Sequence, residues 1–103
     1  MCTQLKEVVF SEGLQKIGED AFYYCRSLKR ITLPSAITEI GERAFYGCTR
    51  LRKVVFNEGL QRIGDWAFCD CSSLESITLP STIIEVDAQA FRNCTQLREV
   101  FLH

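Results

Sequence analysis

Cysteine is the residue type in this chain that offers the widest chemistry, and its spacing is regular. Five of the six cysteines follow one another at steps of 23 residues, and these are Cys2, Cys25, Cys48, Cys71 and Cys94. A thiol can form a disulfide, bind zinc or fill a tight corner of a core. The sixth, Cys69, makes the only close pair with Cys71, whereas zinc sites normally show C-x₂₋₄-C elements or histidines. We therefore expect no metal site.

The regular cysteines predict a ladder of small, buried thiols along one corner of a stacked structure. Disulfides are the alternative, because neighbouring rungs would have Cα atoms about 4.8 Å apart, within bonding range. Parallel side chains keep their Cβ atoms near that same spacing, however, and a disulfide prefers about 3.8 Å. Cys69 stands outside the ladder, where other repeats have Tyr23 and Tyr46. We expect it to be a surface thiol that reacts readily.

The remaining composition argues against catalysis, nucleic-acid binding and membrane insertion. His103 is the only histidine, and we find no phosphate-binding loop, dinucleotide fingerprint or nucleophile elbow, so we expect no enzyme and no cofactor. A net charge of −1 lacks the basic excess of duplex-binding proteins. No apolar run approaches the roughly 18 residues that span a bilayer. Lys6 and Glu7 interrupt the N-terminus, so we expect no secretory signal there.

The cysteine spacing belongs to an internal repeat that covers the chain. Leucines and alanine-phenylalanine pairs recur in step with the cysteines, as at Leu28 and Ala44-Phe45. The 103 residues form one domain with repeats at 2–24, 25–47, 48–70 and 71–93 and a partial repeat at 94–103. Two repeat types alternate: the first and third share VVF and EGLQ, and the second and fourth share ITLPS.

Each repeat predicts the same short elements. Alternating apolar residues predict strands over 5–10, 28–33, 51–56, 74–79 and 97–102. A second apolar pair, such as Leu14 and Ile17, predicts a brief back strand. Gly18, Gly41 and Gly64 recur before acidic residues, which favours a left-handed backbone or a helix start, and we expect one helical turn near 19–24, 42–47, 65–70 and 88–93. Asp87 replaces this glycine in the fourth repeat, and we expect a looser turn there.

A repeat of this length cannot fold alone. Its apolar side chains contribute roughly 10–20 kcal/mol, whereas ordering it costs roughly 35 kcal/mol. Stacking must supply the difference, so equivalent strands pair in parallel and the chain forms a solenoid. We expect its coil to be right-handed.

The predicted strands place three columns of side chains on one exposed sheet face. The first column is Lys6, Lys29, Arg52, Glu75 and Arg98. The second column is Glu7, Arg30, Lys53, Ser76 and Glu99. The third column is Val9, Thr32, Val55, Thr78 and Phe101. Six basic residues against three acidic ones give this face a charge of +3 on a chain of −1.

We interpret this face as a candidate binding surface for an acidic protein partner, centred on the basic cluster of Lys29, Arg30, Arg52 and Lys53. The alternative is a solvated sheet whose charges prevent aggregation. The face covers roughly 400–500 Å², and a standard interface takes about 800 Å² per partner. We add Trp66 as a contact candidate, since its equivalents in other repeats are polar and tryptophan is frequent in binding hot spots.

The strings C-x-x-L-x-x-I-T-L-P-S and I-G-x-x-A-F-x-x-C resemble the BspA-type leucine-rich repeat, also called the Treponema pallidum-type repeat, over residues 2–103. The resemblance implies a leucine-rich-repeat solenoid with a parallel sheet on one face. It also implies a surface protein, in some members an adhesin that binds matrix proteins.

We therefore expect a non-catalytic protein-binding or adhesion scaffold, and we expect the chain to be a fragment of a longer array. The alternative is a module that stacks end to end, because uncapped ends expose a strand edge with apolar residues such as Leu97, Val100 and Leu102.

Overall fold

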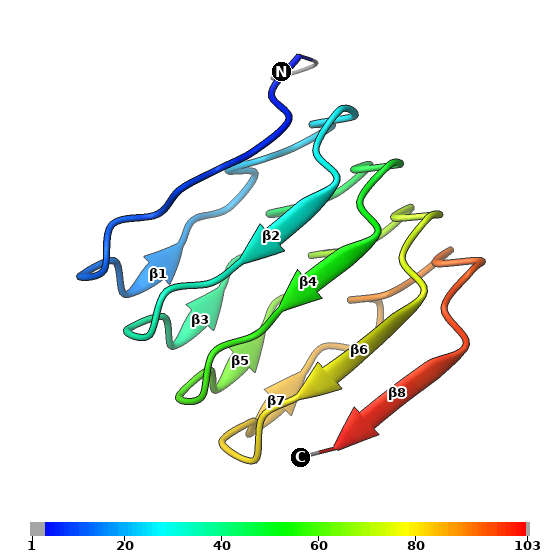
Figure 1. Cartoon of the computed structure of the whole chain (residues 1–103). Helices are drawn as coiled ribbons and strands as arrows, with labels where there is room; N and C mark the ends of the chain where they lie inside the picture. Colours follow the sequence, from blue (N-terminus) through cyan, green and yellow to red (C-terminus); the bar gives the residue numbers. More distant parts are fainter. Residues whose placement is uncertain (1–3, 103) are drawn as a thin grey trace.

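The computed structural model describes residues 4–102 and shows a solenoid of about four coils (Figure 1). Along the chain the strands alternate between a back layer and a front layer, and all pairings are parallel. The front strands are β2 (Arg30–Thr32), β4 (Lys53–Val55), β6 (Ser76–Leu79) and β8 (Glu99–Leu102). The back strands are β1 (Lys16–Ile17), β3 (Glu39–Ile40), β5 (Arg62–Ile63) and β7 (Glu85–Val86).

The two layers differ in continuity. The back strands form one sheet in the order β1-β3-β5-β7, which confirms the brief back strand predicted from the second apolar pair. The front strands form two separate pairs, β2-β4 and β6-β8, although the four strands lie side by side (Figure 1). They are shorter than predicted. The strand predicted over 5–10 is wrong, because no strand forms there, and Leu5 is 37% exposed whereas its equivalents Leu28 and Leu51 are fully buried.

Ladders of identical side chains fill the space between the layers. Leu28, Leu51 and Leu74 are fully buried, as the repeat predicts. Phenylalanine rings stack from coil to coil, with centroids 5.2 Å apart between Phe22 and Phe45 and 5.1 Å apart between Phe45 and Phe68. The core is therefore a set of columns that run along the solenoid axis, which is why a single repeat has no core of its own.

The predicted helical turns are wrong, because residues 4–102 contain no helix. Asp20 and Tyr24 have positive φ, which interrupts a right-handed helix. Backbone donors also alternate in their partners: Tyr23 bonds back to Asp20, whereas Phe22 and Tyr24 bond to Ala44 and Tyr46 of the next coil. These turns satisfy their polar backbone between coils instead of within a helix.

Close approach of the coils explains the recurring glycine. A Cβ added at Gly41 would lie 2.8 Å from the backbone nitrogen of Glu19 in the preceding coil. The sequence analysis explained this glycine by a left-handed backbone or a helix start. The structure shows instead that Gly41 has no positive φ and that a side chain at this position would collide with the preceding coil. At Asp87 the turn is rearranged: Gln89 lacks the positive φ of its equivalents, and its nitrogen bonds 3.0 Å away to Oδ1 of Asp65.

Candidate binding groove

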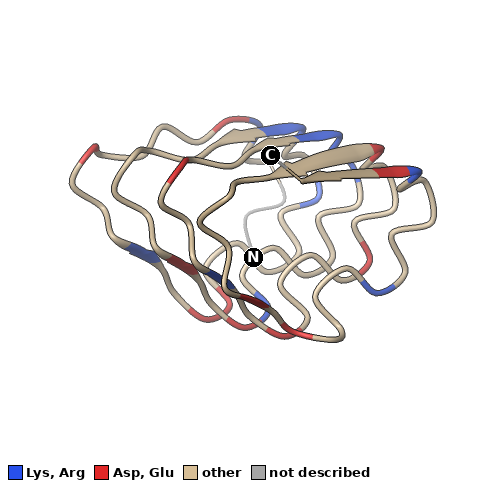
Figure 2. Cartoon of the chain, turned by 90° about the horizontal axis from the view of Figure 1, so that it is seen from below, with Lys and Arg blue, Asp and Glu red and all other residues tan. Residues whose placement is uncertain are grey.

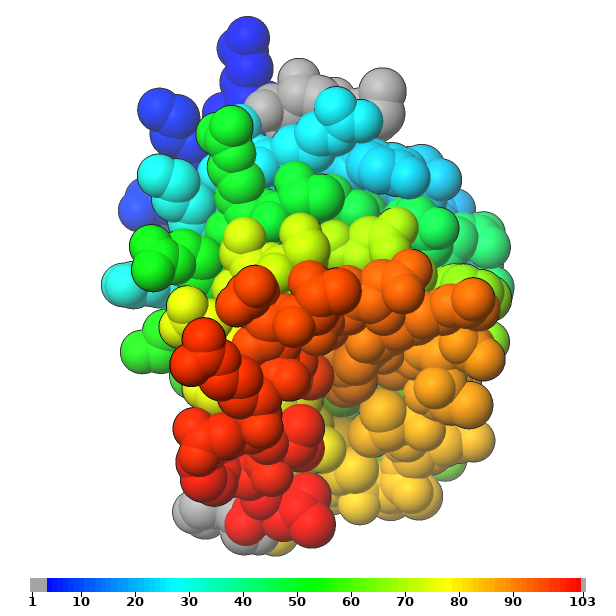
Figure 3. Space-filling model, turned by 90° about the vertical axis from the view of Figure 1, so that its right-hand side faces the viewer, coloured from blue at the N-terminus to red at the C-terminus, as the bar shows by residue number. Residues whose placement is uncertain are grey.

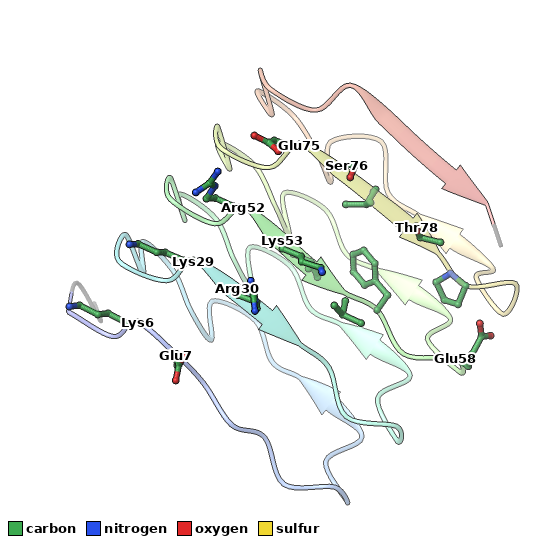
Figure 4. Close-up of a pocket in the computed structure, with 15 residues that line it drawn as sticks. Lys6, Glu7, Lys29, Arg30, Arg52, Lys53, Glu58, Glu75, Ser76 and Thr78 are labelled. Atoms are coloured by element: carbon green, nitrogen blue, oxygen red, sulfur yellow. The ribbon is translucent and has the colours of Figure 1, made fainter.

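A groove of about 1280 Å³ lies on the face of the front layer, over β2, β4 and β6 (Figure 4). Its walls combine basic, acidic and apolar side chains. The lining residues are Lys6, Glu7, Lys29, Arg30, Arg52, Lys53, Val54, Val55, Phe56, Glu58, Glu75, Ser76, Ile77, Thr78 and Pro80.

The basic cluster of Lys29, Arg30, Arg52 and Lys53 lies along one wall of this groove, and all four side chains are exposed. Strand alternation accounts for the direction of Arg30 and Lys53, since Ile31 and Val54 beside them point into the core. Lys29 and Arg52 precede the two strands and are exposed as well. The register pairs Arg30 directly with Lys53, as the predicted second column requires. Figure 2 shows two blue stretches next to each other in the upper layer.

Like charges placed directly opposite each other destabilise a sheet. Within residues 4–102, none of the four basic side chains forms an ion pair. The cluster therefore carries an uncompensated positive charge, which its fold does not require.

The back layer arranges its charges in the opposite way. Its register runs Lys16, Glu39, Arg62 and Glu85, so the sign alternates at every coil. Lys16 lies 3.6 Å from Glu39, and Arg62 lies 3.8 Å from Glu85. A sheet of this solenoid can therefore carry exposed charges of alternating sign that compensate one another. The front layer differs, because it pairs Arg30 with Lys53.

Arg43 provides a further example of compensation beside the back layer. Its guanidinium lies 2.8 Å from Asp20, 3.1 Å from Glu19 and 3.2 Å from Glu42. The hydrogen bond to Asp20 and the surrounding carboxylates raise the pKa of Arg43 above its ordinary value. This exposed network joins two coils, and it occupies the Arg43 guanidinium with carboxylates of the chain itself.

The groove also has an apolar part that sequence reasoning missed. Val54 and Ile77 are almost fully buried, yet both contribute to the groove lining, together with Phe56 and Pro80. Val55 stands beside them and is 40% exposed. The alternating pattern assigned Val54 and Ile77 to the core, and no local signal in the sequence marks the place where they reach a groove.

The other predicted contact residues divide between the groove and the remaining surface. Lys6 and Val55 line the groove. Arg98 is exposed on the last coil but is not among the lining residues. Trp66 lies apart from the groove and is half-buried, so the structure does not bring it together with the basic cluster.

Trp66 belongs instead to an aromatic cluster on the turns that follow the back strands. Its ring lies 6.4 Å from Tyr46, and the guanidinium of Arg92 lies 5.5 Å from its centroid. Tyr46 in turn stacks on Tyr23 at 5.3 Å. These contacts give Trp66 an intramolecular packing role between coils.

The cysteine ladder is confirmed for Cys48, Cys71 and Cys94, which are free thiols. Each donates to a phenylalanine carbonyl of the preceding coil, at 3.3, 3.3 and 3.1 Å respectively. Burial raises the pKa of Cys48 to about 12 and that of Cys94 to about 11. Cys25 takes part in a disulfide, so at this rung the ladder follows the alternative and not the predicted free thiol. Cys2 belongs to the ladder in the sequence and lies outside the described residues.

The expectation that Cys69 is a reactive surface thiol is wrong. Its side chain is only 1% exposed, and burial, followed by the neighbouring Asp70 carboxylate, raises its pKa. A thiol that is protonated and covered is a poor nucleophile. Within residues 4–102, no cluster of three or more histidine, cysteine or acidic side chains could hold a metal ion.

Parallel strands at one position of every 23-residue coil, leucine ladders and alternating exposed columns together define a leucine-rich-repeat solenoid. The chain belongs to the BspA-type leucine-rich repeat family, whose model, described as the BspA type leucine rich repeat region (6 copies), matches residues 1–103. No helix in residues 4–102 is long and apolar enough to cross a membrane. None of the curated proteins compared with the chain matches it significantly.

Solved structures of similar proteins support this assignment. A leucine-rich repeat protein from Bacteroides capillosus is 29% identical with a TM-score of 0.79, over 87% of this chain and 64% of that one. The leucine-rich repeat protein of T. pallidum is 33% identical with a TM-score of 0.62, over 84% of this chain and 51% of that one. A leucine-rich cell surface protein from Faecalibacterium prausnitzii is 28% identical with a TM-score of 0.62, over 90% of this chain and 31% of that one.

The chain thus spans less than two thirds of the length of these solved proteins. Proteins of this family are generally non-catalytic scaffolds for protein interaction or adhesion, and they are in general cell-surface proteins.

Proposed function

We propose that this chain is a non-catalytic protein-binding scaffold, and that its front groove binds an acidic segment of a partner protein. The observation that carries the proposal is the in-register pair of Arg30 and Lys53, which has no acidic partner in the described residues. The back layer of the same solenoid compensates its charges, so the uncompensated pair is not a requirement of the fold. Its like charges lower stability, and an acidic ligand would relieve that repulsion.

The size of the face sets the expected strength of binding. A groove over three strands offers less than the about 800 Å² per partner of a standard interface. We therefore expect weak binding with strong salt dependence, because exposed charges are screened at moderate ionic strength. A longer array of coils would extend the same face.

A displayed library of random peptides tests the proposal without knowledge of the natural partner. The chain should enrich acidic peptides at low salt, and their capture should fall when the salt is raised to about 0.5 M. The variant with Arg30→Glu and Lys53→Glu keeps a like-charge pair, so its stability should stay near that of the parent chain while its preference turns to basic peptides. Enrichment without any charge bias, or the same peptides for both proteins, would refute the proposal.

A second candidate function is end-to-end self-association, which the exposed last coil favours. Val100 and Leu102 are 53% and 80% exposed, whereas the equivalent Ile77 and Leu79 are buried. Figure 3 shows this coil, coloured orange to red, spread over the side nearest the viewer. A further coil or a second copy of the chain would cover these side chains.

Light scattering on a sizing column, in reducing buffer and over a range of concentrations, tests this second candidate. Stacking predicts a mass that grows with concentration from 11.8 kDa and that returns to the monomer in the variant Leu102→Lys. The variant Val55→Lys, which changes the groove and not the last coil, serves as the control and should still associate. A monomer at every concentration would eliminate the stacking function.

A further inference from the structure

The hydrogen-bonded ladder of the front layer is interrupted between β4 and β6, in the floor of the groove. Across β2 and β4, the backbone nitrogen of Arg52 donates to the carbonyl oxygen of Lys29, and that of Leu33 donates to Val55. Across β6 and β8, the backbone nitrogen of Arg98 donates to the carbonyl oxygen of Glu75. In the described residues β4 and β6 are not paired, and neither Phe56 nor Glu75 makes the backbone bond that its equivalent, Leu33 or Arg98, makes in the neighbouring pair. Two strands that lie side by side without being paired leave a seam in the sheet, and side chains below the sheet can reach its surface there.

Side chains at the exit of β4 fasten this strand toward the preceding coil. Asn57 is only 9% exposed and donates from Nδ2 to the carbonyl oxygens of Ser35 at 3.3 Å and Ile37 at 2.8 Å. Pro80, at the exit of β6, has no N–H with which to bond across the seam. The contacts at the exits of β4 and β6 therefore account for the seam between the two strands.

An apolar slot lies over this seam, which we define by Val54, Val55, Phe56, Ile77 and Pro80. The basic cluster begins at Lys53, one residue before the slot along β4. Figure 4 shows Lys29 and Arg52 toward one end of the groove, Glu58 toward the other, and Arg30 and Lys53 between them. The groove thus offers a basic part, then an apolar part, then a carboxylate.

Acidic residues bound the basic part on both sides. Glu7 precedes Arg30 in its column, and Glu75 follows Arg52 in the neighbouring column. The positive surface therefore spans two coils, which is roughly 5–10 Å across the strands. A long polyanion would meet Glu7 and Glu75, whereas two neighbouring carboxylates fit between them.

We infer that the groove recognises a short extended peptide segment in which two acidic residues stand one to three residues from a bulky apolar residue. This inference rests on the proposed function, since it names the partner of the same groove. The acidic pair would lie against Arg30 and Lys53, and the apolar side chain would fill the slot. Each residue of an extended chain advances about 3.3 Å, so this spacing matches the step from Lys53 to Phe56.

Fluorescence anisotropy with labelled synthetic peptides tests the inference on the whole chain. The first peptide contains Asp-Glu-Gly-Phe, the second replaces Phe by Ala, the third replaces Asp-Glu by Asn-Gln, and the fourth moves Phe six residues away. We expect the first to bind best, with the dissociation constant about five- to tenfold weaker for each of the others. Raising the salt should weaken the first peptide and leave the third nearly unchanged.

Two variants with exposed positions separate the slot from general surface effects. Val55→Ser removes an apolar wall of the slot and should abolish the preference for Phe over Ala, while the preference for acidic residues remains. Ile84→Ser removes an apolar side chain that is 67% exposed and outside the groove, so it should leave every peptide unchanged. The urea midpoint of each variant shows whether the solenoid has remained folded.

The outcomes separate the inference from the proposed function. Equal binding of the Phe and Ala peptides, with no effect of Val55→Ser, would overturn the slot and leave an acidic partner in place. Binding that is no tighter for acidic than for neutral peptides would overturn both.

Discussion

Replacing Lys53 by Glu should stabilise the solenoid although it removes a residue from the proposed binding site. In the parent chain Lys53 lies directly opposite Arg30 across the β2-β4 pair, and both side chains are exposed. Two unit charges about 6 Å apart in water interact by about 0.7 kcal/mol. Reversal of one sign changes this repulsion into an attraction of similar size, and screening at 0.1 M salt reduces the total. We expect the free energy of unfolding to rise by about 0.5–1 kcal/mol.

Urea denaturation of both proteins, at 0.05 M and at 1 M salt, measures this difference. The gain should nearly vanish at 1 M salt, where the Debye length is about 3 Å. Lys53→Gln removes the repulsion without adding attraction, so it should give about half of the gain.

Arg62→Glu is the matched control, because it makes the same kind of change on the back layer. Arg62 lies in register between Glu39 and Glu85, so the substitution places three carboxylates in a row. Two attractions are replaced by two repulsions, and we expect a loss of about 1–2 kcal/mol. A loss of stability for Lys53→Glu at low salt, or the same sign for both substitutions, would refute the charge argument.

Three further predictions concern the fold. Gly41→Ala should lower the free energy of unfolding by more than about 2 kcal/mol, because the added Cβ would lie 2.8 Å from the backbone of the preceding coil. Gly18→Ala is the control and should be nearly neutral, because nothing lies within 4 Å of the added Cβ. Equal urea midpoints for the two variants would contradict this difference. Phe45→Ala should cost about 3–5 kcal/mol by the same assay, since its ring is fully buried between two others, and a loss below about 1 kcal/mol would argue against the aromatic ladder. Burial raises the pKa of the Cys48 thiol in the folded state to about 12, against an ordinary value of 9.0, so the unfolded chain loses this proton first. The free energy of unfolding should therefore fall as the pH rises from 9 to 12, by up to about 4 kcal/mol. Cys48→Ala should flatten this decline, and an unchanged slope would show that other groups cause it.

The repeat length made the columns of the front layer predictable. Residues that are 23 positions apart must face the same way in any stacked arrangement of these coils, so Arg30 had to stand opposite Lys53 once parallel pairing was inferred. The same argument identified the leucine, phenylalanine and cysteine ladders. Family resemblance and structure agree here because both follow from the same periodic pattern.

Predictions that depended on the path of the turns were less successful. Cys69 replaces tyrosines that are partly exposed, yet the smaller side chain is covered by its neighbours. Trp66 replaces polar residues, yet it packs against Tyr46 and Arg92. Comparison of residue types at equivalent positions indicates what is usual at a site, and it does not indicate how closely the adjacent turn approaches.

The sequence by itself determined the coil length, the faces of the strands, the identity of the core ladders and the excess of positive charge on one layer. These properties follow from spacing and side-chain alternation, which are local. Only the tertiary structure decided that the ladder breaks between β4 and β6, that Val54 and Ile77 reach the groove, and that Gly41 is needed for space. Those properties depend on distances between coils, which are set by the packing of whole layers and are not encoded in any one repeat.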